Sequence, residues 1–108
     1  MKAIVHKCEW LSKPIMAEIS TEEVELPEKD RLKYLQKIVG GLIEIVSVEI
    51  DGVMKDLIVN EEGLLIDLPM NPWAQGKGLS LAGTVIEIHG QLDDVLKVFF
   101  SLDKELIR

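Results

Sequence analysis

Residues 42–59, LIEIVSVEIDGVMKDLIV, decide the fold that we expect for this chain. Two runs rich in Ile and Val flank Asp51-Gly52, a dipeptide typical of the two-residue type I′ hairpin turn. We therefore expect two antiparallel strands, over residues 42–50 and 53–59, that pair with each other.

The apolar positions of the first of these strands change phase in its middle. Ile43 and Ile45 share one phase of the alternation. Val48 and Ile50 share the other phase. A β-bulge at Val46-Ser47 would bring all four side chains to one face of the sheet. The alternative is a regular strand that is buried on both faces.

Two strands and a helix are expected before this hairpin. Residues 2–8 mix apolar and polar side chains over the length of a strand, and residues 15–26 alternate as a half-buried strand does, at least to Thr21. Apolar side chains at helical spacing then predict a helix that begins near Pro27 and ends at Gly40-Gly41, where glycine permits a left-handed stop.

After the hairpin we expect a second reversal, a third strand and a long loop. Residues 60–63, NEEG, form the reversal, with Gly63 placed for a positive φ. Residues 64–68 continue the meander as its third strand. Two prolines and two glycines between residues 69 and 80 predict a shaped loop, with one helical turn after Pro72.

The end of the chain is predicted to add one strand and one helix. Residues 82–89 are enriched in Thr, Val and Ile, and apolar side chains over residues 92–106 form the stripe of a closing helix. The sequence thus predicts a single α+β domain over residues 1–108, in the order β-β-α-β-β-β-loop-β-α. Its framework would be a mainly antiparallel sheet of five to six strands with two helices packed on it.

Charge and cysteine content limit the partners and the compartment. The net charge is −7, and residues 44–94 hold ten acids but only two bases. Direct nucleic-acid binding is therefore not expected, whereas a protein with a basic surface suits the chain. A single cysteine, Cys8, suits a reducing compartment. Because no apolar run approaches the roughly 18 residues of a membrane span, we expect a cytoplasmic protein that does not enter a membrane.

No motif of a known catalytic or nucleotide-binding site is present, so we expect no catalytic residues and no cofactor. His6, Cys8 and His89 lack the paired spacing of zinc ligands and are interpreted as ordinary strand residues, so no metal is expected. Enzymatic activity is disfavoured but stays open. It would need Glu44 or Asp67 buried beside one of the two histidines.

The loop at residues 69–80 carries conspicuous side chains. Trp73 either plugs the core or offers an aromatic anchor to a partner, and the core role is favoured because an exposed loop tryptophan lowers solubility. Asn71 and Asn60 are expected to hydrogen-bond to the backbone of their own loops. The sequence Gly76-Lys77-Gly78 is too short to form a phosphate cradle without a strand and a helix around it.

Several short stretches together resemble one known family. They are LQKIVGGLIE at residues 35–44, VNEEG at 59–63, LPMNPWA at 68–74 and LAGTV at 81–85. In this order and spacing they are similar to the domain of unknown function 3846, found in small proteins of bacteria and their phages. The resemblance implies a phage or prophage setting and carries no established activity.

If the family shares a site, the resemblance implies that its motif positions form it. These positions are Gln36, Gly41, Glu44, Asn60, Glu61, Asn71 and Ala74. Trp73 and Lys77 join them as candidate partner or ligand contacts. Folding alone also explains the motif residues, because the glycines cap a helix, residues 60–63 turn a hairpin and Asn71 ties down a loop.

We expect a small acidic accessory protein that binds a host protein without catalysis, for example to inhibit a host defence system. The alternative is a protein that sequesters a small molecule such as a nucleotide signal at the 69–80 loop, with Lys77 and Lys37 as its positive groups. A homodimer is possible if the first strand or the acidic meander leaves an open sheet edge.

Overall fold

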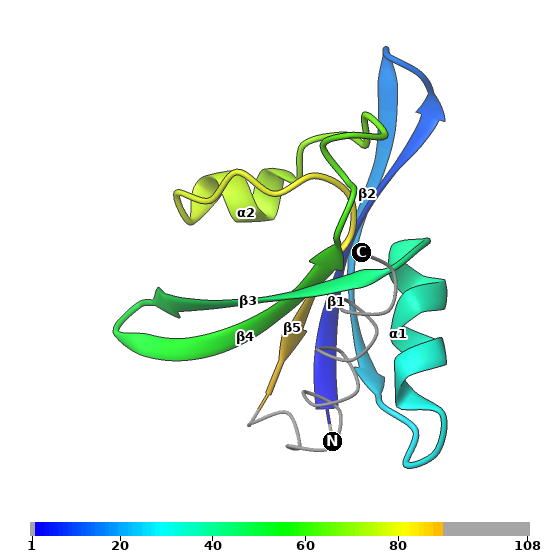
Figure 1. Ribbon diagram of the computed structural model, residues 1–108. Coiled ribbons are helices and arrows are strands. Elements are labelled where there is room, and N and C mark those ends of the chain that lie inside the picture. Colours follow the sequence, from blue (N-terminus) through cyan, green and yellow to red (C-terminus); the bar gives the residue numbers. More distant parts are fainter. Residues whose placement is uncertain (1, 90–108) are drawn as a thin grey trace.

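The computed structural model describes residues 2–89, which form a five-stranded antiparallel sheet in the order β2-β1-β5-β4-β3 (Figure 1). The strands are β1 (Lys2–Ser12), β2 (Met16–Glu25), β3 (Ile43–Ile50), β4 (Val53–Asn60) and β5 (Val85–Ile88). The short central strand β5 joins the two long hairpins β1–β2 and β3–β4. The expected α+β class is confirmed.

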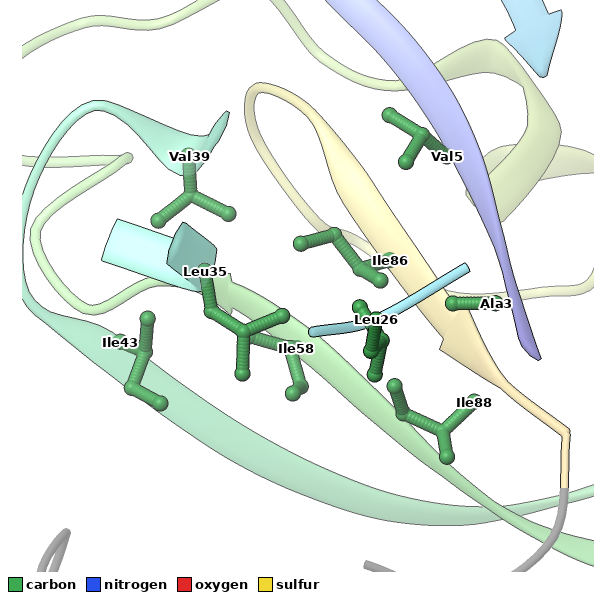
Figure 2. Packing of buried hydrophobic residues seen from close by; sticks show 9 residues of the cluster. All are labelled: Ala3, Val5, Leu26, Leu35, Val39, Ile43, Ile58, Ile86 and Ile88. Carbon is green, nitrogen blue, oxygen red and sulfur yellow. The ribbon is translucent and has the colours of Figure 1, made fainter. Parts of the chain in front are cut away.

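One face of the sheet packs against helix α1 (Arg31–Val39). The buried side chains between them, labelled in Figure 2, are Ala3, Val5, Leu26, Leu35, Val39, Ile43, Ile58, Ile86 and Ile88. Leu35 at the centre of the helix is fully buried. The periodic apolar stripe seen in the sequence is therefore the surface that holds α1 on the sheet.

The opposite face is covered by the loop that contains the short helix α2 (Pro72–Gly76). A second apolar cluster lies there, made of Ile50, Leu57, Val59 and Val85 with the half-buried Val46, Val48, Trp73, Leu79 and Leu81. The helical turn expected after Pro72 is confirmed, and Asn71 caps it. We refer below to the α1 face and the α2 face of the sheet.

The hairpin turn at Asp51-Gly52 and the end of α1 are as the sequence predicted. Asp51 and Gly52 have φ of 52° and 81°, the two positive values that a type I′ turn requires. Gly40 ends α1 in the left-handed conformation with φ of 79°. The helix begins later than expected, because Asp30 is left-handed and Arg31 Nε donates to the Pro27 carbonyl.

The expected β-bulge at Val46-Ser47 is wrong. Strand β3 pairs with β4 in one unbroken register from Ile43 opposite Asn60 to Ile50 opposite Val53. Side chains from both phases of the β3 alternation are buried, because Ile43 belongs to the α1-face cluster and Ile50 to the α2-face cluster. The alternative, burial of both faces, is the one that the structure adopts, because each face has its own cover.

The third meander strand expected at residues 64–68 is also wrong. This segment is a series of turns, in which Ile66 N donates to Glu62 O and Leu68 N donates to Gly63 O. Gly63 does not have the predicted positive φ. It is needed instead for close packing, because a Cβ there would lie 2.9 Å from the Ala82 carbonyl oxygen.

The sequence predicted that residues 15–26 form a half-buried strand. Strand β2 is more exposed than that, because it forms an edge of the sheet. Strand β5 pairs only with Ala3–His6 of β1, so the rest of β1 is paired with β2 alone. The β1–β2 hairpin therefore projects as a two-stranded ribbon beyond the sheet (Figure 1). The closing helix predicted over residues 92–106 lies outside the described residues.

Candidate functional site

Three charged or titratable side chains meet on the α2 face, from three different strands. Glu87 of β5 accepts a hydrogen bond at Oε1 from Lys55 Nζ of β4, at 2.6 Å. Its Oε2 lies 3.0 Å from Nε2 of His6 on β1. The His6 and Glu87 side chains are only 6% and 7% exposed, whereas Lys55 is 30% exposed and reaches the solvent. Antiparallel pairing thus assembles a buried cluster from residues 81 positions apart.

The electrostatics of this cluster keep the Glu87 carboxylate ionised. Burial raises the pKa of the Glu87 carboxyl, but hydrogen bonds and charge from Lys55 and His6 outweigh it and bring the pKa below its ordinary value. The second ring nitrogen of His6, Nδ1, lies 3.5 Å from Thr21 Oγ1. A carboxylate held by two such contacts is poorly suited to take a proton from a substrate, and the cluster fastens three strands together.

Helix α2 seals this cluster. The Trp73 ring stacks on the His6 imidazole, with ring centroids 3.9 Å apart and planes 9° apart. Asn71, 1% exposed, accepts a hydrogen bond from Ala74 N and donates through Nδ2 to the His6 and Gly83 carbonyls. The core role favoured for Trp73 fits this half-buried position, and Asn71 ties down its loop as expected.

Sequence reasoning missed this cluster. It interpreted His6 as an ordinary strand residue and gave Glu87 no role. The signal was available in residues 85–88, VIEI, where one carboxylate interrupts a strand that is otherwise apolar and is buried throughout. A buried Glu needs a cationic partner, and Lys55 is one of only two bases in the acidic middle of the chain.

Cys8 and Asp67, which the sequence analysis considered for a metal site and for catalysis, lie in separate surroundings. In the range 2–89 no three His, Cys, Asp or Glu side chains are grouped to hold an ion. Cys8 is buried, and its Sγ faces the Pro69 and Met70 carbonyls; burial raises the pKa of this thiol. Asp67 is exposed and pairs with Lys13, so it does not lie beside a histidine.

The motif residues Glu44, Asn60 and Glu61 come together at a different place, a cavity of about 290 Å³. Its other walls are Gly63, Leu64, Leu65, Ser80, Leu81 and Ala82. Asn60 donates to the Val39 carbonyl and accepts from Glu62 N, which fixes the end of β4 to the end of α1.

Gln36 and Gly41 belong to this same corner of the fold. The Gln36 carbonyl accepts hydrogen bonds from Gly40 N and Gly41 N at the end of α1. A Cβ on Gly41 would lie 2.9 Å from Asn60 Nδ2. The predicted site residues therefore separate into one group around Asn60 and another around Asn71, and most of both groups have a folding role.

The two lysines of the small-molecule alternative lie apart. Lys77 follows α2 and pairs with Asp51 at 3.5 Å. Lys37 lies on α1, at the other face, and lines a cavity of about 440 Å³ together with Val5, Lys7, Glu9, Glu22, Val24, Tyr34, Ile38 and Thr84. Within residues 69–80 only Ser80 lines either of these two cavities.

Exposed apolar side chains gather on two adjoining segments, the end of the β1–β2 ribbon and the turns at residues 61–70. We call this group the apolar tip; it consists of Leu11, Ile15, Met16, Ile19, Leu64, Leu65, Ile66 and Met70, which are 37% to 86% exposed. Its two β2 members, Met16 and Ile19, lie on opposite faces of the ribbon. Trp10 Nε1 donates to the Asp67 carbonyl at 2.8 Å, and Lys13 pairs with Asp67 at 3.1 Å. These contacts hold the two segments side by side (Figure 1).

The apolar tip was not foreseen from the sequence. The prediction of a third strand at residues 64–68 assigned those side chains to a sheet, and the alternation of β2 suggested that one of its faces was covered. Of ten exposed large apolar side chains in the described part of the chain, eight belong to the tip. No helix within residues 2–89 is long and apolar enough to cross a bilayer.

Comparison of the chain with known proteins identifies one family. The domain of unknown function (DUF3846) matches residues 1–107. No curated protein and no solved structure matches the chain. The resemblance noted in the four sequence stretches is thereby extended to almost the whole chain, which belongs to the family of the domain of unknown function 3846.

Proposed function

We propose that the protein acts by non-catalytic binding, and that the apolar tip docks on a protein partner of the host cell. The observation that carries this proposal is the gathering of eight exposed Leu, Ile and Met side chains on two adjoining segments. Groups of exposed apolar side chains on a protein surface mark interaction sites, whereas apolar side chains scattered singly do not.

The charge around the tip indicates the kind of partner. Segments 9–19 and 61–70, which carry the tip, contain five acids and one base, a net charge of −4. A partner that presents an apolar patch bordered by Lys or Arg would match both the apolar side chains and the carboxylates. This agrees with the basic protein surface expected from the composition.

The buried cluster supports the same reading. His6 and Glu87 are covered by Trp73, and their contacts join strands, so they provide a rigid sheet from which the ribbon projects. Contacts that fix the base of the ribbon lower the entropic cost of binding, because fewer conformations are lost when the partner binds. Inhibition of a host defence system would be one use of such contact.

The test compares capture of a partner from host lysate by three proteins. The first is the wild type, the second carries Ile15→Ser with Leu65→Ser in the tip, and the third carries Val53→Ser with Met54→Ser in the β3–β4 hairpin. The third is the matched control, because Val53 and Met54 are also exposed, 56% and 66%, but lie outside the tip.

We expect a stoichiometric partner with wild type and control, at low and moderate salt, and its loss with the tip variant. Ile15 and Leu65 are each 86% exposed, and burying such a side chain contributes about 1.5–3 kcal/mol, so the double change should weaken binding roughly a hundredfold or more. Equal capture by tip variant and control, or no stoichiometric partner, would refute the proposal. A wild-type dimer in light scattering that becomes a monomer in the tip variant, but not in the control, would assign the surface to a second copy instead.

A further inference from the structure

We infer that the free edge of β2 binds an extended segment of the partner as an added strand, and that this segment alternates basic and apolar residues. This inference rests on the proposed function, because β2 carries Met16 and Ile19 of the apolar tip. It names the chemistry of the partner, which the tip alone does not.

Strand β2 has the properties of an accepting edge. It is ten residues long and ends the sheet, and among residues 2–89 it pairs with β1 alone, so every second backbone N–H and C=O points away from the described sheet. Proteins usually protect such edges with charged side chains, above all Lys, or with Pro, bulges or short strands. Residues 16–25, MAEISTEEVE, contain neither Lys nor Pro, and their charged side chains are all glutamates, which repel an acidic strand but not a basic one. The one irregularity in the β1–β2 register is at the tip end of β2.

The side chains of β2 specify what an added strand should carry on each face. Ala17, Ile19 and Thr21 lie opposite Trp10, Cys8 and His6, on the α2 face. Glu18 and Glu22 lie on the α1 face, Glu22 directly opposite Val5. Over residues 17–22, side chains on an added strand would lie about 5 Å from these residues, so apolar residues fit the first row and Lys or Arg the second. Beyond Glu22 the pattern reverses, because Glu23 and Glu25 lie on the α2 face and Val24 on the α1 face.

The glutamates also argue against a second copy as the occupant. Strand β2 has four of them, Glu18, Glu22, Glu23 and Glu25, and no base. Two β2 strands paired edge to edge would bring eight carboxylates together, which is unfavourable for directly opposed like charges. Glu18 pairs with Lys7 at 3.3 Å and Glu23 with Lys2 at 3.6 Å, but Glu22 has no ion-pair partner in the described part of the chain and can receive one.

The probe is a ten-residue peptide of alternating lysine and valine, added to the isotope-labelled full chain. We expect amide shifts centred on residues 16–25 and slower hydrogen exchange at every second amide of β2, the signature of new strand pairing. A peptide of alternating glutamate and valine, and the lysine peptide N-methylated at alternate residues, should bind at least tenfold more weakly.

Two charge-reversal variants localise the contact. Glu22→Lys should weaken the lysine peptide roughly tenfold at low salt, whereas Glu49→Lys, an exposed position on the opposite edge strand β3, should leave its affinity unchanged. Because both glutamates are exposed, we expect both variants to fold. Unchanged spectra of each variant without peptide would confirm this. Equal effects of the two variants, protection on β3 instead of β2, or binding that survives N-methylation would overturn the inference.

The outcomes separate this inference from the proposed function. If the tip variant loses its partner but the lysine peptide gives no β2 protection, the edge is not used and the docking proposal stands. If the peptide binds β2 but no partner is captured through the tip, the proposed function fails and the edge site stands. Protection of β2 amides in the free protein that rises with concentration would show self-pairing and refute a basic occupant.

Discussion

Replacement of Glu87 by Ala tests whether the buried cluster holds the sheet together. The change leaves His6 and Lys55 without the carboxylate that bonds to both, at 3.0 and 2.6 Å. Removing one member of a buried ion pair typically costs about 3–5 kcal/mol. We expect the lower end, about 3 kcal/mol, because Lys55 is 30% exposed and can be hydrated once it is released.

Urea unfolding measures this loss directly. A domain of this size has a free energy of unfolding of about 5–15 kcal/mol and an m-value of about 1–3 kcal/mol/M, so the midpoint should fall by about 1–3 M. Glu49→Ala, at an exposed position on β3, serves as the control and should shift the free energy of unfolding by less than about 0.5 kcal/mol. A Glu87→Ala variant as stable as this control would refute the role that we assign to the cluster.

The pH dependence gives the same reasoning a second check. The pKa of Glu87 is lower in the folded protein than its ordinary value of 4.5, so below about pH 4.5 the unfolded chain binds more protons at this site. The stabilisation by Glu87 is therefore complete above that pH and is lost as the pH falls through the folded value. The gap in stability between wild type and Glu87→Ala should narrow on acidification from pH 6; a constant gap would contradict the assignment.

Four further substitutions, one of them a control, have expected outcomes in the same unfolding assay. Asn71→Ala removes a helix cap and two hydrogen bonds to buried backbone carbonyls, which should cost about 3 kcal/mol; a loss below about 1 kcal/mol would contradict these bonds. Gly52→Ala places a Cβ at φ of 81° and should cost about 1 kcal/mol, whereas Gly76→Ala, with open space around it and a negative φ, should be nearly neutral. Trp73→Leu removes the ring stacked on His6 and should cost about 2 kcal/mol and speed amide exchange at His6; unchanged exchange would show that the ring is not its cover.

Turns and helix ends that depend on the backbone conformation of one or two residues were predictable from the sequence. Asp51-Gly52 and Gly40 adopt the positive φ values that their positions in the hairpin and helix require. Asn71 and Pro72 start a helical turn, since a side-chain acceptor and a fixed φ act within four residues. The motif stretches likewise pointed to the family that matches almost the whole chain.

The candidate site was only partly predictable, because it depends on which strands become neighbours. The motif pointed to Glu44, Asn60 and Glu61, and these do line one cavity. Nothing local in the sequence shows that β5 lies between β1 and β4, and this order alone puts Glu87 between His6 and Lys55. Pairing across 81 residues is a property of the assembled sheet.

The sequence by itself determined the turns, the helix stripe, the α+β class and the acidic charge, because each depends on residues a few positions apart or on composition alone. Tertiary structure decided which apolar residues are covered. Residues 64–68 have the composition of a strand, yet they turn back on themselves because Gly63 packs against Ala82 and no strand within residues 2–89 pairs with them. Ile15 alternates like a buried residue, yet it is 86% exposed because β5 is too short to accompany the ribbon to its end. Burial depends on what lies opposite a side chain, and within residues 2–89 nothing covers the side chains of the tip.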